Sequence, residues 1–228
     1  MPQILVRRRW SVFPLYFLLV ILAGSCSDGG LGRVRPPRTA PGYVKDNKPA
    51  IWKSSHPRIV FFRDHYRGNT TVDKALDQGS RYLPSIVRSF EARGLPVELA
   101  YLPMLESMFI NRANSGHARG MWQFTQQTAQ HQGLHIGAFS DERLNWRKAT
   151  EAAADYLDQL GERFDYDWAL ALAAYNGGPN YLEDEMRRQG TRDFFRLRLR
   201  KETEEYVARF VAMLQVVRER YPGEIAQR

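Results

Sequence analysis

The 228-residue chain has one cysteine, Cys26. A single thiol cannot form a disulfide within the chain, and it cannot complete a zinc site built from several cysteines. His117, His131 and His135 lack the spacing that is typical of metal ligands. We therefore predict no metal site, and we expect these histidines to be exposed polar residues.

The sequence also lacks a convincing strand pattern and a solenoid repeat. Its apolar residues recur at helical spacing instead, and 43% hydrophobic residues are enough to build a buried core. The pattern predicts helices over about 70–93 with an interruption at Pro84, 96–107, 122–131, 147–163, 167–178 and 202–220. We therefore predict a mainly α, compact domain with little or no β-sheet.

The apolar run over residues 10–23 is too short for a typical membrane-spanning helix. Three arginines precede it and Gly-Ser-Cys follows it, as in a secretory signal peptide. The segment resembles a bacterial lipoprotein signal with Leu-Ala-Gly-Ser before Cys26. That resemblance implies removal of residues 1–25, a lipid on Cys26 and an outer-membrane anchor facing the periplasm. The alternative is ordinary cleavage that gives a soluble periplasmic protein.

Acidic residues are fewer than basic ones, and the net charge is +8. Residues 1–25 hold three arginines and no acid, so their removal leaves +5 (8 − 3). Export argues against nucleic acid as a partner, whereas a mildly basic exported protein suits an anionic polymer or a membrane surface. Residues 26–58 are rich in Gly, Pro, Lys and Arg and predict a flexible tether. The helical domain is expected over 59–228, with a catalytic core over about 95–190.

Glu106 stands in the apolar stretch Leu-Ala-Tyr-Leu-Pro-Met-Leu-Glu-Ser. Burial disfavours a charged carboxylate and raises its pKa. A carboxyl that stays protonated near neutral pH can donate its proton to a leaving group. Glu106 is therefore the candidate general acid, and the alternative is an ordinary glutamate on a helix surface.

Several short runs accompany Glu106 in a fixed order. They are the Glu-Ser pair at 106–107, the Ser…Gly-Met-Trp-Gln-Phe run at 115–124, the Ala-Tyr-Asn-Gly-Gly run at 174–178, and two flanking stretches at 95–99 and 191–207. Together they resemble the lytic transglycosylases with a goose-type-lysozyme fold, and most of all the membrane-bound lytic murein transglycosylase D branch. The resemblance covers about residues 70–220 and implies a lysozyme-like helical domain. The insert at 117–119 departs from the commoner forms of its loop.

The resemblance implies an enzyme that binds peptidoglycan strands and cleaves the β-1,4 bond between N-acetylmuramic acid and N-acetylglucosamine. The product would carry a 1,6-anhydromuramoyl end. Glu106 would act first as acid and then as base, the substrate's N-acetyl oxygen would replace a second carboxylate, and no metal or organic cofactor would be needed. Two alternatives stay open: a hydrolytic muramidase with Asp141 or Glu142 as base, and a non-catalytic glycan-binding lipoprotein.

The resemblance also assigns substrate-binding roles to the residues around the acid. Ser107 and Ser115 would orient Glu106 or the N-acetyl group, and Gln123 would bind sugar through its amide. Met121 and Phe124 would supply apolar walls of the substrate groove. Tyr175 would hydrogen-bond the acid or the N-acetyl group, and Asn176 would bind sugar or hold the turn. Core packing is the alternative for Met121 and Phe124, and a helix cap is the alternative for Ser107.

Overall fold

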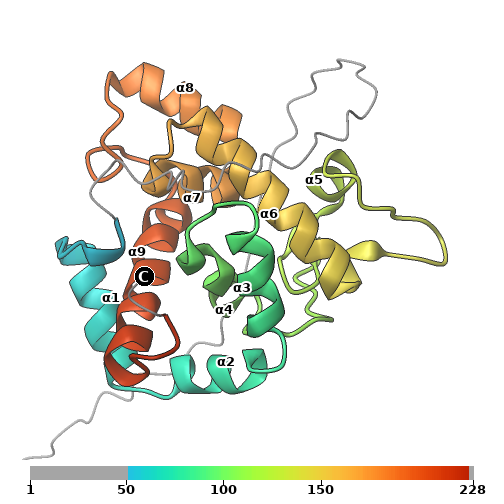
Figure 1. Ribbon diagram of the computed structural model, residues 1–228. Helices are drawn as coiled ribbons and strands as arrows, with labels where there is room; N and C mark the ends of the chain where they lie inside the picture. The colour runs from blue at the N-terminus through green and yellow to red at the C-terminus, as the bar shows by residue number, and fades with distance from the viewer. Residues whose placement is uncertain (1–50, 226–228) are drawn as a thin grey trace, which may run out of the picture.

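The computed structural model describes residues 51–225, and it confirms the predicted mainly helical fold. The signal peptide, Cys26 and most of the expected tether lie outside the described residues. Within residues 51–225 no helix is long and apolar enough to cross a membrane. Figure 1 shows the helices packed around one another, with a loop between α5 and α6 extending away from them.

The helices are α1 (Pro57–Arg67), α2 (Thr71–Gly79), α3 (Leu83–Glu91), α4 (Leu102–Glu106), α5 (Gln126–His131), α6 (Trp146–Arg163), α7 (Trp168–Gly177), α8 (Pro179–Gln189) and α9 (Lys201–Arg220). Three short 3₁₀ helices are η1 (Ile51–Lys53), η2 (Val97–Tyr101) and η3 (Glu142–Leu144). The strands β1 (Ala118–Arg119) and β2 (Phe124–Thr125) pair antiparallel, with Ala118 opposite Thr125.

Helix α7 lies at the centre of the core. The Asp167 side chain caps its first turn by accepting hydrogen bonds from the amides of Ala169 and Leu170. Its next residues are apolar on every side and are buried through Ala174. A helix that is hydrophobic all round requires neighbours all round. Accordingly α6, α8 and α9 all pack against it.

Helix α9 is amphipathic and lies beside α1, at the left of Figure 1. The apolar stripe predicted for it is buried, including Tyr206 and Phe210. The buried Trp52 of η1 meets the edge of the Phe210 ring at a centroid distance of 6.2 Å. Packed structure thus begins before residue 59, the boundary that the tether composition predicts. Helix α1 was not predicted as a separate helix.

Prolines divide two segments that the sequence pattern joins. The interruption expected at Pro84 is a split: residues 70–93 form two helices, and Pro84 lies in the first turn of α3. Pro103 lies in the first turn of α4, after the 3₁₀ helix η2. The first turn is where a missing amide hydrogen costs nothing, so each proline begins a helix instead of bending one.

The helix predicted over 122–131 begins later, at Gln126, where Thr125 caps it. Residues 118–125 form the short hairpin of β1 and β2, which was not predicted. Helix α8 was not predicted either; it follows the left-handed Gly178 and has proline at its first position. Both misses occur where turn chemistry outweighs apolar periodicity.

Candidate active site

Glu106 is the last residue of α4, in a turn with unusual backbone geometry. The amides of Ser107 and Phe109 both donate to the Pro103 carbonyl, at 3.0 and 3.1 Å. Met108 and Phe109 adopt left-handed φ values of 54° and 58°. Such conformations are costly for side chains larger than glycine, and they persist where surrounding packing fixes them. Phe109 is 1% exposed, so core packing holds the turn that presents Glu106.

The packing of Phe109 depends on Gly79 at the end of α2. A Cβ added to Gly79 would lie 2.7 Å from the Phe109 ring. Only glycine lets the ring approach α2 this closely. The position of the Glu106 turn therefore rests on a contact between two distant parts of the chain.

The Glu106 carboxyl is surrounded by protein, although the residue remains partly exposed. The Tyr206 hydroxyl of α9 donates a hydrogen bond to its Oε1. Burial raises the pKa of Glu106 to about 8, the negative charge of Glu202 adds to this, and the Tyr206 hydrogen bond opposes it. The raised pKa expected from the sequence is thus confirmed. Glu106 holds its proton at neutral pH.

Tyr175 of α7 lies close to Glu106 without a hydrogen bond to it. Its hydroxyl donates to the Trp122 carbonyl at 2.8 Å. Burial, and then the negative charge of Glu106, hold the pKa of Tyr175 well above its ordinary value. Its ring lies 6.3 Å from that of Phe124 and 5.6 Å from that of Tyr156. Tyr175 thereby ties α7 to the turn of the hairpin beside the acid.

Ser107 joins the acid to the same hairpin. It is 8% exposed, and its hydroxyl donates to the Met121 carbonyl at 2.7 Å. Gln123, at a left-handed φ of 48°, donates from its amide to the Gly120 carbonyl at 2.7 Å. Met121 is fully buried and Phe124 is 2% exposed. Both residues pack in the core, and their roles as groove walls stay predictions.

The other two predicted site residues, Ser115 and Asn176, form hydrogen bonds within a loop and between two helix ends. The Ser115 hydroxyl contacts the backbone of Ala118 within its own loop, at 3.3 Å. Asn176 accepts a hydrogen bond from the Thr203 hydroxyl at 2.8 Å, and it also hydrogen-bonds Glu202. Asn176 therefore connects the end of α7 to the first turn of α9. Sugar binding by Ser115 and Asn176 stays a prediction.

Sequence reasoning missed two residues of this site, Tyr206 and Glu202. Tyr206 was assigned to the buried stripe of α9 only. A signal was present, because residues four apart share one face of a helix. Glu202 and Tyr206 are four residues apart, on a side of α9 that is otherwise apolar. A carboxylate and a phenol in these positions indicate a polar partner across the helix interface.

Residues 51–225 contain no group of three or more His, Cys, Asp or Glu side chains that would hold a metal ion. Around Glu106 the described site supplies a protonated carboxyl, hydroxyl groups and amides, with the Glu202 carboxyl nearby. Such a set can donate a proton to a leaving oxygen and accept one back.

The fold and site thus describe a helical domain that holds a protonated glutamate between a short helix, a hairpin and a long C-terminal helix, suited to proton transfer. Residues 84–197, half of the chain, match the family model of the transglycosylase SLT domain. The chain belongs to this family.

Among its relatives, membrane-bound lytic murein transglycosylase D of Escherichia coli (strain K12) is 33% identical over 142 residues, covering 60% of this chain and 31% of that protein. A putative tributyltin chloride resistance protein of Alteromonas sp. (strain M-1) is 42% identical over 98 residues, 42% of this chain and 47% of that protein. Peptidoglycan transglycosylase gp16 of Escherichia phage T7 is 37% identical over 98 residues, but only 7% of its length is covered. The chain thus spans about a third of the first relative.

Proposed function

We propose that the protein is a peptidoglycan lytic transglycosylase. It cleaves the β-1,4 bond between N-acetylmuramic acid and N-acetylglucosamine and leaves a 1,6-anhydromuramoyl end. Membership of the transglycosylase SLT family supports the substrate class. The observation that carries the proposal is Glu106, a single carboxyl whose pKa burial raises to about 8 at a partly exposed position.

In the first step Glu106 donates its proton to the glycosidic oxygen. Tyr206 occupies Oε1 as a donor, and within the described range no residue hydrogen-bonds Oε2. Oε2 is therefore the oxygen that carries the transferable proton. As the bond between the anomeric carbon and the oxygen breaks, Glu106 becomes a carboxylate, and the Tyr206 hydroxyl stabilises the new charge. The N-acetyl oxygen of the substrate stabilises the positive charge at the anomeric carbon.

In the second step the same carboxylate removes the proton from the 6-hydroxyl of the muramoyl residue. The freed oxygen attacks the anomeric carbon of its own sugar and closes the anhydro ring. Glu106 regains its proton, so the cycle balances without water. A group on the same molecule reaches effective concentrations of about 10⁵ M or more, which allows it to outcompete water.

The hydrolytic alternative requires a second carboxylate that is free to activate water. Asp141 accepts two hydrogen bonds from the Arg143 guanidinium, at 2.9 and 2.7 Å, which lowers its pKa. Glu142 is bound by Lys148 and by the His135 amide, which lowers its pKa as well. Both carboxylates are engaged as structural ion pairs, which favours the lyase over the muramidase.

Product analysis tests the proposal. Purified peptidoglycan is digested with the wild-type protein and with the Glu106→Gln variant, and the muropeptides are analysed by mass spectrometry. We expect anhydromuramoyl ends from the wild type and none from the variant. Glu224→Gln, a change at an exposed glutamate, serves as the matched control and should give wild-type products. Reducing ends without anhydro products would overturn the lyase mechanism, and full turnover by the Glu106 variant would remove that residue from it.

We also propose that Cys26 carries a lipid that anchors the domain to the outer membrane on its periplasmic side. The signal-like sequence before Cys26 supports this proposal. Fractionation of cells that express the wild type or Cys26→Ala tests it. Recovery of the wild type with outer membranes and loss of that association in the variant are expected. Equal release of both proteins with the periplasmic fraction would favour the soluble alternative.

A further inference from the structure

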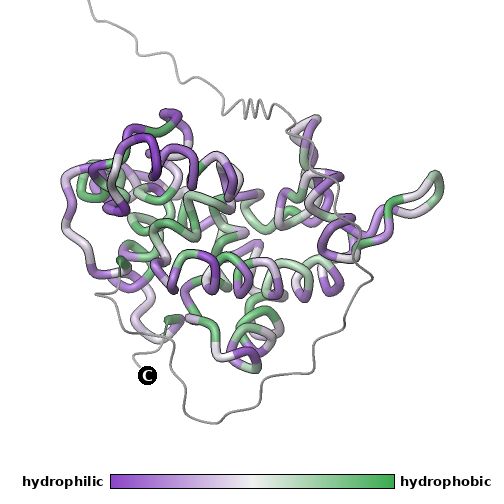
Figure 2. Tube along the Cα trace, turned by 90° about the horizontal axis from the view of Figure 1, so that it is seen from above, coloured by the Kyte–Doolittle hydropathy of each residue, from purple (hydrophilic) through white to green (hydrophobic). Residues whose placement is uncertain are grey.

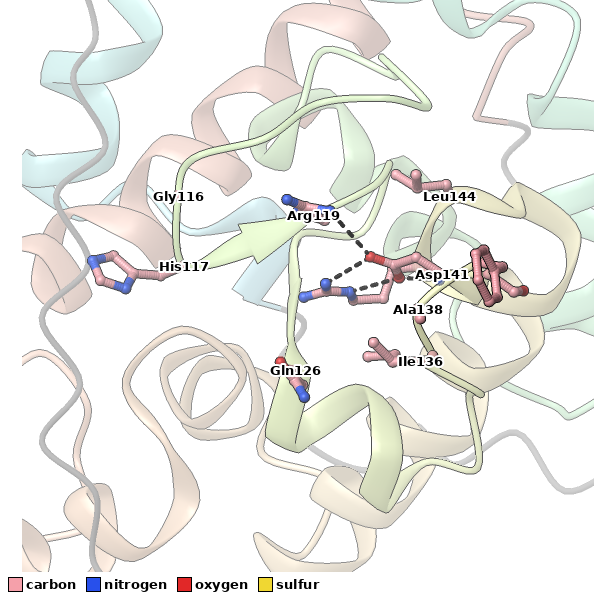
Figure 3. Close-up of a pocket in the computed structure, with 12 residues that line it drawn as sticks. Gly116, His117, Arg119, Gln126, Ile136, Ala138, Asp141 and Leu144 are labelled. Atoms are coloured by element: carbon pink, nitrogen blue, oxygen red, sulfur yellow. Dashed lines mark hydrogen bonds and ion pairs between the residues drawn. The ribbon is translucent and has the colours of Figure 1, made fainter.

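A cavity of about 480 Å³ lies between the hairpin and the loop that joins α5 to α6. Figure 3 shows Arg119 of β1 and Gln126 of α5 on its hairpin side, and a dashed line joins Arg119 to Asp141. Residues 137–140 complete the lining and are all exposed, with Phe139 standing fully in solvent. Figure 2 shows that the end of this extended loop is hydrophobic. The cavity is distinct from the surroundings of Glu106 described above.

The charges of the cavity do not balance. Arg143 is 6% exposed and forms a two-pronged ion pair with Asp141. Its remaining nitrogen donates to the Phe124 carbonyl at 3.3 Å, so each of the three guanidinium nitrogens of Arg143 makes a hydrogen bond within the protein. Arg119 is also directed at Asp141, but its Nη1 lies 3.6 Å from the carboxylate. Two cations therefore share one anion, and the lining residues carry one positive charge in excess.

Arg119 is the residue with donors left for a ligand. Its side chain is 46% exposed, its ion pair with Asp141 is long at 3.6 Å, and its guanidinium forms no hydrogen bond among residues 51–225. His117, on the same insert, points away from the Arg119–Asp141 pair in Figure 3. A guanidinium with unused donors at the mouth of a cavity matches a carboxylate, which it can bind through two parallel hydrogen bonds.

We propose that this cavity is a subsite for a carboxylate of the peptide that branches from the muramoyl residue, with Arg119 as its ligand. The inference rests on the proposed function, because it takes peptidoglycan as the substrate. The glycan strand of peptidoglycan is uncharged, whereas its peptide branches carry free carboxylates and small apolar side chains. Arg119 complements the carboxylate, and the exposed ring of Phe139 offers an apolar surface to those side chains.

The hairpin links this subsite to the catalytic acid. Arg119 is the last residue of β1, and the turn that follows supplies the carbonyls that accept from Ser107 and Tyr175. Gly120 packs so closely on the opposite loop that an added Cβ would lie 1.9 Å from the Arg143 carbonyl. One rigid hairpin therefore carries both Arg119 and the contacts that position Glu106. A peptide held at Arg119 would fix the muramoyl residue relative to the acid.

The test compares two substrates that differ only in the peptide. One is intact, peptide-bearing glycan, and the other is the same glycan stripped of peptide by an amidase. For Arg119→Gln we expect kcat/KM to fall by about tenfold on the peptide-bearing strands, as for a lost charge-assisted hydrogen bond, and mainly through KM. On stripped strands it should stay within about twofold of the wild type, because the contact is absent there.

Two further variants separate binding from structure. Arg88→Gln removes an exposed arginine of α3 that does not line the cavity, and it should match the wild type on both substrates. Arg119→Lys keeps the charge but loses the planar fork, so it should recover part of the lost activity. Equal losses on both substrates, or no loss on either, would overturn the subsite.

A binding measurement keeps this proposal separate from the proposed function. Isolated stem peptide is titrated calorimetrically into the Glu106→Gln variant, with and without Arg119→Gln. Binding that the second change weakens by about tenfold supports the subsite even if turnover gives no anhydro product. Absence of peptide binding, together with normal anhydro products from the wild type, would refute the subsite and leave the proposed function standing.

Discussion

Replacing Glu106 by glutamine should make the folded protein more stable, and increasingly so as the pH rises. Folded Glu106 keeps its proton up to about pH 8, whereas in the unfolded chain the carboxyl ionises near its ordinary pKa of 4.5. Between these values the folded state binds more protons, so its free energy of unfolding falls as pH rises. Glutamine is uncharged throughout, and it can still accept the hydrogen bond from Tyr206. The variant therefore escapes the cost of burying a carboxylate.

The size of the effect follows from the two pKa values. The interval from 4.5 to about 8 spans about 3.5 pH units (8 − 4.5). At about 1.36 kcal/mol per unit, the upper bound is about 5 kcal/mol above pH 8. Because Glu106 remains partly exposed, solvent reduces this cost, and we expect about 3 kcal/mol. Below pH 4.5 both proteins carry an uncharged side chain, and the difference should vanish.

Urea unfolding of wild type and variant at intervals from pH 4 to pH 9 measures this difference directly. Every other titrating group is common to the two proteins and cancels in the comparison. Glu224→Gln removes an exposed carboxylate and controls for the change of net charge. If the difference in free energy of unfolding between wild type and Glu106→Gln stays constant over this range, Glu106 is not a buried carboxyl that keeps its proton in the folded state.

Three further outcomes follow from the same geometry. The kcat/KM of the wild type should fall about tenfold per pH unit above about pH 8, where Glu106 loses its proton, and a flat profile would exclude it as the acid. In the same pH–rate assay, Tyr206→Phe should move this fall to higher pH and Glu202→Gln should move it to lower pH, because the hydroxyl lowers and the carboxylate raises the pKa of Glu106. Gly120 has φ +82°, and an added Cβ would lie 1.9 Å from the Arg143 carbonyl, so Gly120→Ala should lower the free energy of unfolding by about 3 kcal/mol or more. At Gly116 φ is +89° but the space is open, so Gly116→Ala should lower it by only about 1 kcal/mol. Thermal melting of both glycine variants checks this, and equal losses would contradict the close packing at Gly120.

The sequence predicted the fold where apolar periodicity was strong. The helix predicted over 167–178 forms as α7, and the stripe of α9 that contains Phe210 is buried, as expected. It failed where local chemistry decides the backbone. Helix α8, which follows the positive φ of Gly178, was not predicted, and the 118–125 hairpin takes up residues 122–125, which were assigned to a helix. These elements depend on caps and positive φ values, which periodicity does not record.

The raised pKa of Glu106, the candidate acid, was predictable, because a carboxylate in an apolar stretch is costly unless its proton is retained. Its hydrogen-bond partner was not. Tyr206 lies 100 residues further along the chain, and an apolar stripe does not distinguish a tyrosine that packs from one that donates. Tyr175 was expected to hydrogen-bond the acid or the N-acetyl group of the substrate. It lies beside Glu106, but its hydroxyl donates to the Trp122 carbonyl, and its contact with the substrate stays a prediction. Which hydroxyl reaches Glu106 is decided by how α7 and α9 pack, and this is tertiary information.

In the proposed mechanism, the arrangement around Glu106 would reconcile two opposing requirements of a residue that acts as acid and then as base. Burial alone would keep the carboxyl protonated and make it a poor base in the second step, while full solvation would leave it ionised before the first. The Tyr206 hydrogen bond lowers the pKa that burial raises, so the balance lies near pH 8 rather than higher. A pKa close to the working pH gives one group access to both states during a cycle. Helix α9 supplies that correction from beyond residue 197, where the match to the family model ends. The functional unit of this chain therefore includes the long helix that follows the matched segment.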